Sequence, residues 1–370
     1  MNPLTPPDTA RRQFLKSVTA GSVVAGLAAC GGGGGERSNP VPPASTRTWR
    51  LGFSPNPPRP TTQAVITGID LWSQRAELAV IHEEMPWRDL LAGMTPDAIL
   101  DRDKVQLVNY LRGKGLQLVY IGDLNDGLSR PDEAPQRRAL GRSLTESTVQ
   151  WAHRDYMVVV VRRLTPEFVG LAAETNLIRA AAPAALYQAV VRTANDTADA
   201  IRAAGAAMPL LISVQVETAW GVLGGNGSYV GIDTDRTDFP FIDMLGLSSY
   251  PYFAYARPED IPDDYYSRVL LGTGLPCMAT EGGWTSANVG SFTSSPGMQA
   301  RYVTRQAQLR DSVSARALLH LLFADPDMAT FPQPLPPNLP LFASIGLTDS
   351  EFNPKPSLAS WDALHRRRLL

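Results

Sequence analysis

The chain has 370 residues, a net charge of −2 at neutral pH, four histidines and two cysteines. A mildly acidic balance argues against a nucleic-acid partner, which would require a basic stripe on the surface. The four histidines are scattered, which argues against a zinc site, and nothing in the sequence calls for a cofactor.

Residues 1–29 are predicted to be an export signal. The twin-arginine pair Arg11-Arg12 precedes an apolar stretch, 18–29, that is too short to span a bilayer permanently. The stretch ends in Leu-Ala-Ala-Cys, which resembles a bacterial lipobox, so Cys30 is the expected lipidation site. The alternative is a plain cleaved signal with an incidental cysteine. Residues 30–47, rich in Gly, Pro and Ser, predict a flexible tether. We therefore expect twin-arginine export and a periplasmic or cell-surface lipoprotein.

Residues 48–370 alternate short apolar runs with helical patterns, which predicts βα units and a parallel sheet in one domain. The candidate strands are 48–54, 77–81, 115–121, 168–173, 209–216, 244–249, 276–280 and 317–323. The candidate helices are 95–112, 143–163, 181–204, 265–273 and 296–313. Eight such units predict an α/β fold, the (β/α)8 TIM barrel. The alternative, a doubly wound open sheet, needs a phosphate-binding glycine turn after the first strand, and the sequence has none there.

Two of the predicted strands end in a glutamate. Glu174 closes the fourth strand and Glu281 the seventh. Chemistry in a barrel collects at the strand ends, and glycoside hydrolysis needs two carboxylates, one to protonate the leaving oxygen and one to attack or to activate water. A retaining enzyme would hold the two about 5–5.5 Å apart. The alternative is that each glutamate caps the helix that follows it.

Carboxylates, amides and aromatic rings follow the other strand ends. Aromatic faces stack on sugar rings while carboxylates and amides bond hydroxyl groups, so this lining predicts a carbohydrate substrate. The expected contacts are His82, Asp123, Asn125, Asn176, Gln215, Glu217, Tyr250 and Trp284. Glu217 is also a rival for the acid/base role. Cys277 lies in an apolar strand and is expected to be a small buried residue.

Three segments resemble a known clan of enzymes. The first is Thr-Glu-Gly-Gly-Trp at 280–284, and the second is Gly-Leu-Ser-Ser-Tyr-Pro-Tyr at 246–252. The third is Gly-Leu-Thr-Asp at 346–349, together with Asn-Pro-Lys-Pro at 353–356 and Trp361. They are similar to the nucleophile strand, the sixth strand and the closing segment of clan A glycoside hydrolases, which are retaining (β/α)8 enzymes. Within the clan, the segments most resemble family 53, the endo-β-1,4-galactanases.

The resemblance implies a role for each matching residue. Glu281 would be the nucleophile and Glu174 the general acid/base. Tyr250 would hold the nucleophile through its phenol, a donor that keeps a carboxylate ionised. Trp284 would be a sugar platform near the cleavage point.

The sequence departs from the clan at Ala173. The clan has an asparagine at this position, directly before the acid/base, and that asparagine bonds the sugar 2-hydroxyl. Asn176, Asn125 and Gln215 are the candidates to replace this donor. Without a replacement, either the substrate lacks the usual 2-hydroxyl contact or the site is weak or inactive.

The leading hypothesis is an exported, membrane-tethered, retaining glycoside hydrolase that acts as a monomer on an oligo- or polysaccharide. The alternative is a non-catalytic carbohydrate-binding lipoprotein on the same fold, because fold alone does not establish function. A scaffold lipoprotein without a ligand is disfavoured by the acidic and aromatic strand ends.

Overall fold

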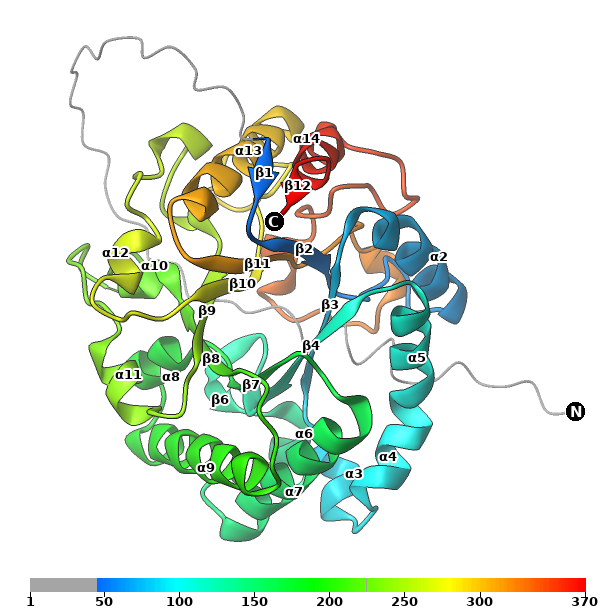
Figure 1. The fold of residues 1–370 in the computed structure, drawn as a ribbon, viewed down its shortest axis with the longest axis vertical. Helices are drawn as coiled ribbons and strands as arrows, with labels where there is room; N and C mark the ends of the chain where they lie inside the picture. Colours follow the sequence, from blue (N-terminus) through cyan, green and yellow to red (C-terminus); the bar gives the residue numbers. More distant parts are fainter. Residues whose placement is uncertain (1–44, 224) are drawn as a thin grey trace, which may run out of the picture.

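The computed structural model describes residues 45–223 and 225–370. The predicted signal at 1–29, the expected lipidation site Cys30 and the tether up to residue 44 lie outside the described residues. Eight parallel strands close into a barrel with helices around it (Figure 1). The predicted (β/α)8 fold is therefore confirmed.

The barrel strands follow one another in chain order, and the last pairs with the first. They are β2 (Arg50–Phe53), β3 (Leu78–Glu84), β4 (Gln117–Asp123), β7 (Phe168–Ala172), β8 (Leu210–Gln215), β9 (Met244–Ser249), β10 (Cys277–Gly282) and β11 (Ala315–His320). Each overlaps one of the eight predicted strands. Cys277 is buried in β10, as expected.

The longer helices cover the outside of the barrel (Figure 1). They are α2 (Thr62–Trp72), α4 (Pro96–Asp103), α5 (Val105–Gly113), α7 (Ser147–Leu164), α9 (Ala184–Ala203), α13 (Pro296–Asp311) and α14 (Pro356–His365). The predicted helix at 95–112 is two helices, α4 and α5, separated at Lys104. The predicted helix at 265–273 is a single turn, α12 (Ser267–Leu270).

Two apolar cores hold the barrel together. The larger lies between the strands and the helices, and a smaller one fills the barrel interior. The interior core consists of Leu78, Val80, Val119, Ile121, Leu211, Met244, Met278, Ala317 and Leu319. Because side chains alternate along a strand, the next inward positions after Val80 and Ile121 are His82 and Asp123. Apolar packing at one level of the barrel thus gives way to polar groups at the strand ends.

A short hairpin follows β4 and was not predicted. It consists of β5 (Asn125–Asp126) and β6 (Ser129–Glu133). The Asn125 side chain donates to the Arg130 carbonyl at 2.9 Å, which ties the two strands together. Asn338 donates to the Leu128 carbonyl at 3.2 Å, so the hairpin also contacts a distant loop. The hairpin is therefore held in place over the carboxyl ends of the strands.

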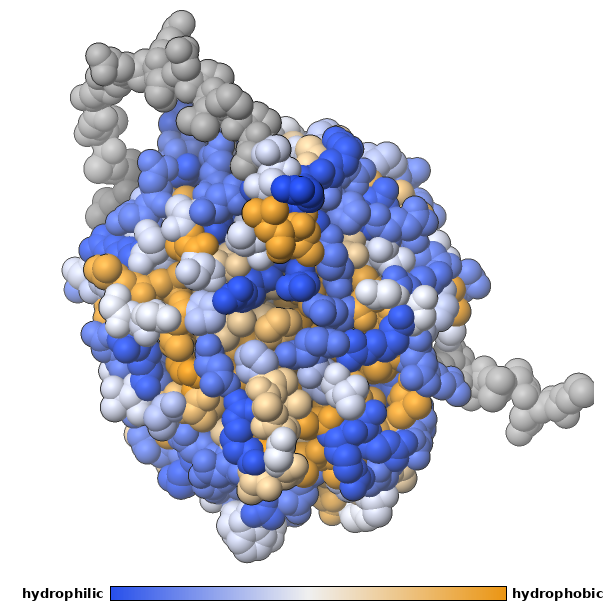
Figure 2. Space-filling view, viewed as in Figure 1, coloured by the Kyte–Doolittle hydropathy of each residue, from blue (hydrophilic) through white to orange (hydrophobic). Residues whose placement is uncertain are grey.

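The first and last described segments lie side by side (Figure 1). Strand β1 (Thr46–Arg47) pairs in parallel with β12 (Arg368–Leu369). No helix in the described ranges is both long and apolar enough to cross a membrane. On the face shown in Figure 2, apolar residues lie in separate patches between hydrophilic ones.

Candidate active site

Glu174 and Glu281 meet at one hydroxyl group. Ser248, on β9, lies between them, with its Oγ 2.6 Å from Oε1 of Glu174 and 2.9 Å from Oε1 of Glu281. These two contacts place the Oε1 atoms of the two carboxylates at most about 5.5 Å apart, which is the upper end of the range for retaining glycosidases. Both glutamates are almost fully buried, with 0% and 1% of their surface exposed. The structure therefore brings together the two carboxylates that the sequence predicted as a pair.

A β-bulge directs Glu281 into the barrel. The register of β10 against β9 shifts between Ala279 and Glu281, so that Glu281 lies opposite Ser248. A bulge of this kind changes the direction of a side chain and often lies near a functional site. The next residue, Gly282, cannot be replaced by a larger residue without strain, because a Cβ atom there would lie 2.6 Å from the Ser249 carbonyl oxygen. The Glu-Gly pair is thus required by the backbone as well as by the site.

Glu174 has a left-handed backbone conformation, with φ of 50° and ψ of 47°. This conformation costs a non-glycine residue on the order of 1–2 kcal/mol. The Glu174 amide donates to Ser213 Oγ at 2.9 Å, which holds the turn between β7 and α8 (Thr175–Ala181). Such strain is commonly retained where it positions a functional group. Here it orients the Glu174 carboxylate toward Ser248.

Arg130, on the hairpin strand β6, joins the site and was missed by the sequence analysis. Its Nε donates to Oε2 of Glu174 at 2.8 Å, and its Nη1 forms an ion pair with Asp123. The side chain is completely buried. The available signal was weak: one arginine within the acidic stretch 123–133.

The charges around the pair are closely coupled. Burial and the Glu174 carboxylate raise the pKa of Glu281 to about 7, against smaller opposite effects of His82, Arg130 and Ser248. Burial also acts to raise the pKa of Asp123, but the combined effects of Arg130 and His82 outweigh it and lower that pKa to about 2. The carboxylates raise the pKa of Arg130 against the effect of burial, so the guanidinium stays charged.

His82 lies between Asp123 and Glu281. Its Nε2 is 3.2 Å from Oδ2 of Asp123, and its Nδ1 is 3.8 Å from Oε2 of Glu281. Both His82 and Asp123 were predicted as substrate contacts. In this structure they form part of the network that holds the carboxylate pair.

Two of the aromatic predictions need correction. The Tyr250 hydroxyl is buried and has no hydrogen-bond partner among the described residues, so it does not hold Glu281. Ser248 contacts that carboxylate instead. Trp284 is 1% exposed, and its indole N–H donates to Ser294 Oγ at 3.0 Å. Its ring packs against Tyr302, so it offers no free face to a sugar.

The three predicted replacements for the missing asparagine are also engaged elsewhere. Asn176 exchanges two 2.8 Å hydrogen bonds with the backbone of Gln215, which fastens α8 to β8. The Gln215 side chain contacts Glu217 and accepts from the Thr218 amide. Asn125 joins the strands of the hairpin. Asn176 and Gln215 therefore use their amides in local contacts, whereas Asn125 uses only its nitrogen, and its Oδ1 is buried with no hydrogen-bond partner among the described residues.

Glu217 forms a separate buried cluster. Its Oε1 accepts from Tyr265 at 2.5 Å and from Ser249 at 2.9 Å. Burial raises its pKa, while these donors act to lower it. Ser248 and Ser249 are adjacent on β9 but contact different carboxylates: Ser248 contacts Glu174 and Glu281, and Ser249 contacts Glu217. The separation of the two clusters argues against Glu217 as the partner of Glu281.

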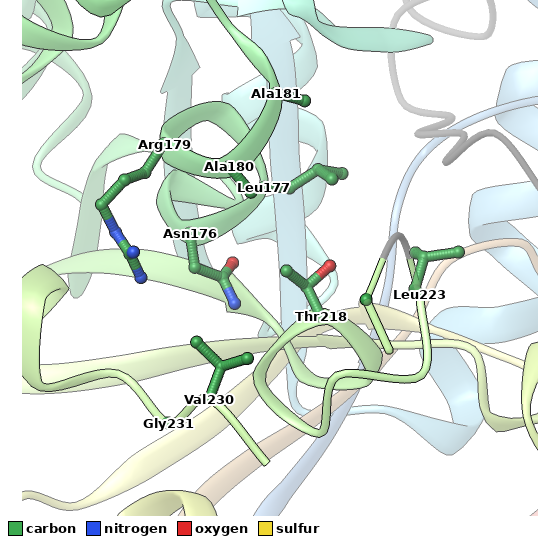
Figure 3. Close-up of a pocket in the computed structure, with 10 residues that line it drawn as sticks. Asn176, Leu177, Arg179, Ala180, Ala181, Thr218, Leu223, Val230 and Gly231 are labelled. Carbon is green, nitrogen blue, oxygen red and sulfur yellow. The ribbon is translucent and has the colours of Figure 1, made fainter. Parts of the chain in front are cut away.

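A cavity of about 130 Å³ lies between α8 and the loop after α10 (Val216–Ala219). Figure 3 shows Asn176 and Arg179 on one side and Thr218, Leu223 and Val230 on the other. Neither Glu174 nor Glu281 lines it. The carboxylate pair, not this cavity, therefore defines the candidate active site. No cluster of three or more potential metal ligands occurs within residues 45–223 and 225–370.

No protein-family model and no curated protein sequence matches the chain. Solved structures do match. An exo-β-1,4-mannosidase from Opitutaceae bacterium strain TAV5 has a TM-score of 0.62 at 16% identity, over 87% of this chain and 60% of that one. A β-glucosidase has a TM-score of 0.59 at 16% identity, over 83% and 88%. A GH53 catalytic domain from Ignisphaera aggregans has a TM-score of 0.50 at 12% identity, over 70% and 78%.

At these low identities, the TM-scores show a shared fold and no more. The similar structures are (β/α)8 glycoside hydrolases of several families, and the GH53 domain is one of them. The comparison does not single out family 53, so that part of the resemblance stays a prediction.

Proposed function

We propose that the protein is a retaining glycoside hydrolase that cleaves β-glycosidic bonds of an oligo- or polysaccharide. The observation that carries the proposal is the Glu174–Ser248–Glu281 contact, which holds two buried carboxylates within about 5.5 Å. The strained backbone at Glu174 and the bulge before Glu281 support it, because both direct the carboxylates to one point. The structural similarity to several β-glycosidases is consistent with it.

In the proposed mechanism, Glu281 attacks the anomeric carbon while Glu174 protonates the leaving oxygen. Glu174 then removes a proton from water, which releases the sugar with its configuration retained. The donor that replaces the clan's asparagine would be Arg130. Its Nη2 is buried and has no hydrogen-bond partner in the described part of the chain, and its Nε already contacts Glu174.

Access to the pair requires a change at the strand ends, because both carboxylates are buried. The β5–β6 hairpin carries Arg130 across them and contacts Asn338 through Leu128. We propose that this hairpin opens to admit the substrate and then closes over it, which returns Arg130 to the carboxylate pair. Movements of loops that expose and then enclose a site are common in enzymes.

The test is hydrolysis of a panel of β-linked polysaccharides and aryl glycosides, with β-1,4-galactan included because of the family 53 resemblance. Turnover should fall by orders of magnitude in Glu281→Gln and Glu174→Gln. Glu217→Gln is the matched control, since it removes a buried carboxylate from the adjacent cluster. Azide should partly restore Glu281→Gly and give a glycosyl azide. Loss of turnover in Glu217→Gln but not in Glu174→Gln would reassign the acid/base.

A non-catalytic carbohydrate-binding protein is the second candidate. Two observations favour it. Ala173 stands where the clan has its asparagine, so the acid/base lacks the usual amide neighbour. In addition, the ion pairs of Arg130 with Asp123 and Glu174 partly neutralise the carboxylates. Absence of hydrolysis across the panel, with sugar affinity that survives Glu281→Gln, would support this candidate and overturn the first.

We also propose export and a lipid anchor at Cys30, on the strength of the twin-arginine and lipobox patterns. Cys30→Ala should move the protein from the membrane fraction to the soluble periplasmic fraction. A wild-type protein that is already soluble, and whose mature sequence starts after residue 30, would contradict the anchor.

A further inference from the structure

The cavity between α8 and the loop after α10 has room for one ring. Its volume of about 130 Å³ is close to that of an engineered protein cavity of about 150 Å³ that binds benzene. Leu177, Thr218 and Leu223 in its lining are buried, whereas Ala180 and Val230 are exposed. Figure 3 shows Thr218 and Leu223 facing α8 across the cavity. A ring-sized group can therefore enter from solvent and contact buried side chains.

The lining is mostly apolar and offers few hydrogen-bonding atoms. Asn176 uses its amide on the backbone of Gln215. The Thr218 hydroxyl is buried without a hydrogen-bond partner among the described residues, and so is Nε of Arg179, whose Nη2 pairs with Asp235. A sugar ring carries several hydroxyl groups, and each one buried without a partner weakens binding. An aromatic ring with one hydrogen-bond acceptor matches this lining better than a sugar does.

The cavity lies beside the proposed acid/base. Leu177, in its wall, donates its amide to the Glu174 carbonyl at 2.9 Å, so the wall begins one helical turn, about 5.4 Å, from that residue. The cavity is formed after β7 and β8, whereas Glu281 belongs to β10. The cavity is therefore on the Glu174 side of the carboxylate pair. Glu174 protonates the leaving oxygen in the proposed mechanism, so the leaving group extends toward this side.

We propose that the cavity binds an aromatic ring that is attached directly to the scissile oxygen. Leu177 and Leu223 pack against the ring, and the Thr218 hydroxyl donates to an acceptor on it. A sugar residue between the ring and the scissile oxygen would carry the ring past a wall that begins one turn from Glu174. The favoured substrates are then sugars or oligosaccharides β-linked to a phenolic ring. This assignment rests on the proposed function, because that function places the leaving group beside Glu174.

The first test is binding of methyl benzoate and of toluene to the full chain without any sugar, measured by saturation-transfer NMR titration. Both rings should bind. Ala180→Phe places a side chain at the exposed part of the lining and should weaken both rings by about tenfold. Ala185→Phe is the matched control, since Ala185 is an exposed residue of α9 outside the lining. Thr218→Val should weaken methyl benzoate by roughly three- to tenfold and leave toluene unchanged, because only methyl benzoate has an acceptor.

Hydrolysis provides the second test, with the sugar that the panel identifies. The kcat/KM for its 4-nitrophenyl β-glycoside, divided by that for its β-linked disaccharide, should fall about tenfold in Ala180→Phe. The ratio should stay at the wild-type value in Ala185→Phe. Comparison of one ratio between variants cancels the greater intrinsic reactivity of the aryl bond.

Four outcomes would overturn the proposal: neither ring binds, Ala180→Phe binds both as wild type does, free glucose or galactose displaces them, or the hydrolysis ratio is the same in all variants. Failure of the proposed function gives a different result. A protein that hydrolyses nothing, yet binds both rings with the expected response to Ala180→Phe and Thr218→Val, would confirm the aromatic site and reject the enzymatic function.

Discussion

Arg130 contacts two carboxylates from neighbouring strands, although it belongs to neither strand. Its position depends on the β5–β6 hairpin folding back over the barrel, and no periodicity in the sequence predicts that. Glu174 and Glu281 were predictable as neighbours, because the carboxyl ends of parallel barrel strands meet at one face. Trp284 was not, since a tryptophan after a strand end can pack inward as easily as it can face a ligand. Residues held by strand ends are therefore easier to assign from sequence than residues held by loops.

At this scale, Glu281 makes stability depend on pH. Its pKa is about 7 in the folded chain, against an ordinary value of 4.5. The folded state therefore binds more protons between these values, so the stability contribution is fully present below about pH 4.5 and is lost as pH rises through about 7. Across this window, the free energy of unfolding of wild type should fall relative to Glu281→Gln by on the order of 3 kcal/mol. Urea denaturation at a series of pH values measures it.

The low-pH limit serves as the internal control for this prediction. Below about pH 4 both proteins carry an uncharged side chain at position 281, so the difference in unfolding free energy should be constant there. A difference that is also constant from acid to mildly alkaline pH would show that Glu281 has the same pKa in the folded and unfolded chains.

At the scale of elements, two departures from the predicted pattern each carry a buried ion pair. Lys104 separates α4 from α5 and pairs with Glu83, and both side chains are almost completely buried. The hydrophobic periodicity of residues 95–112 predicts one continuous helix and does not indicate this break. The hairpin that carries Arg130 could not be predicted from the sequence pattern either, because its two strands are short and polar.

Arg130→Met tests whether this ion pair holds the hairpin. Loss of one partner of a buried pair leaves uncompensated charge, so the variant should lose about 3–5 kcal/mol of stability near neutral pH. The pKa of Asp123 is lowered to about 2 from 3.8, so wild type keeps its advantage above about pH 4 and loses it as pH falls through about 2. Denaturant unfolding at two pH values measures both effects.

Arg138→Met is the control for the hairpin prediction. Arg138 also pairs with acidic residues, Asp126 and Asp132, but its side chain is 49% exposed. Exposed ion pairs contribute about 0–1 kcal/mol, so this variant should stay close to wild type. Equal losses in the two variants would mean that the Arg130 pair does not stabilise the fold more than a surface pair does.

At the scale of the whole molecule, the barrel was predictable because eight apolar runs alternate with helical segments, and each run became a strand. The limits of the folded part were less so. The tether was expected to reach residue 47, but Thr46 and Arg47 form β1 and pair with Arg368 and Leu369. Strands of two residues carry no pattern of their own. They form only because the closed barrel brings distant segments together.

The final prediction concerns this junction between the two ends of the folded part. Arg367 is almost buried: it donates to the Thr46 carbonyl, contacts Asp311 at 2.7 Å, and its guanidinium lies 5.1 Å from the centre of the Trp49 ring. Arg367→Met should therefore cost about 1–3 kcal/mol, because it leaves a buried carbonyl unsatisfied and removes charge-assisted bonds. Arg366→Met is the matched control, since Arg366 is exposed and should change stability by less than about 0.5 kcal/mol. Thermal unfolding should show Arg367→Met several degrees below both other proteins, and equal midpoints would mean that this junction does not stabilise the barrel.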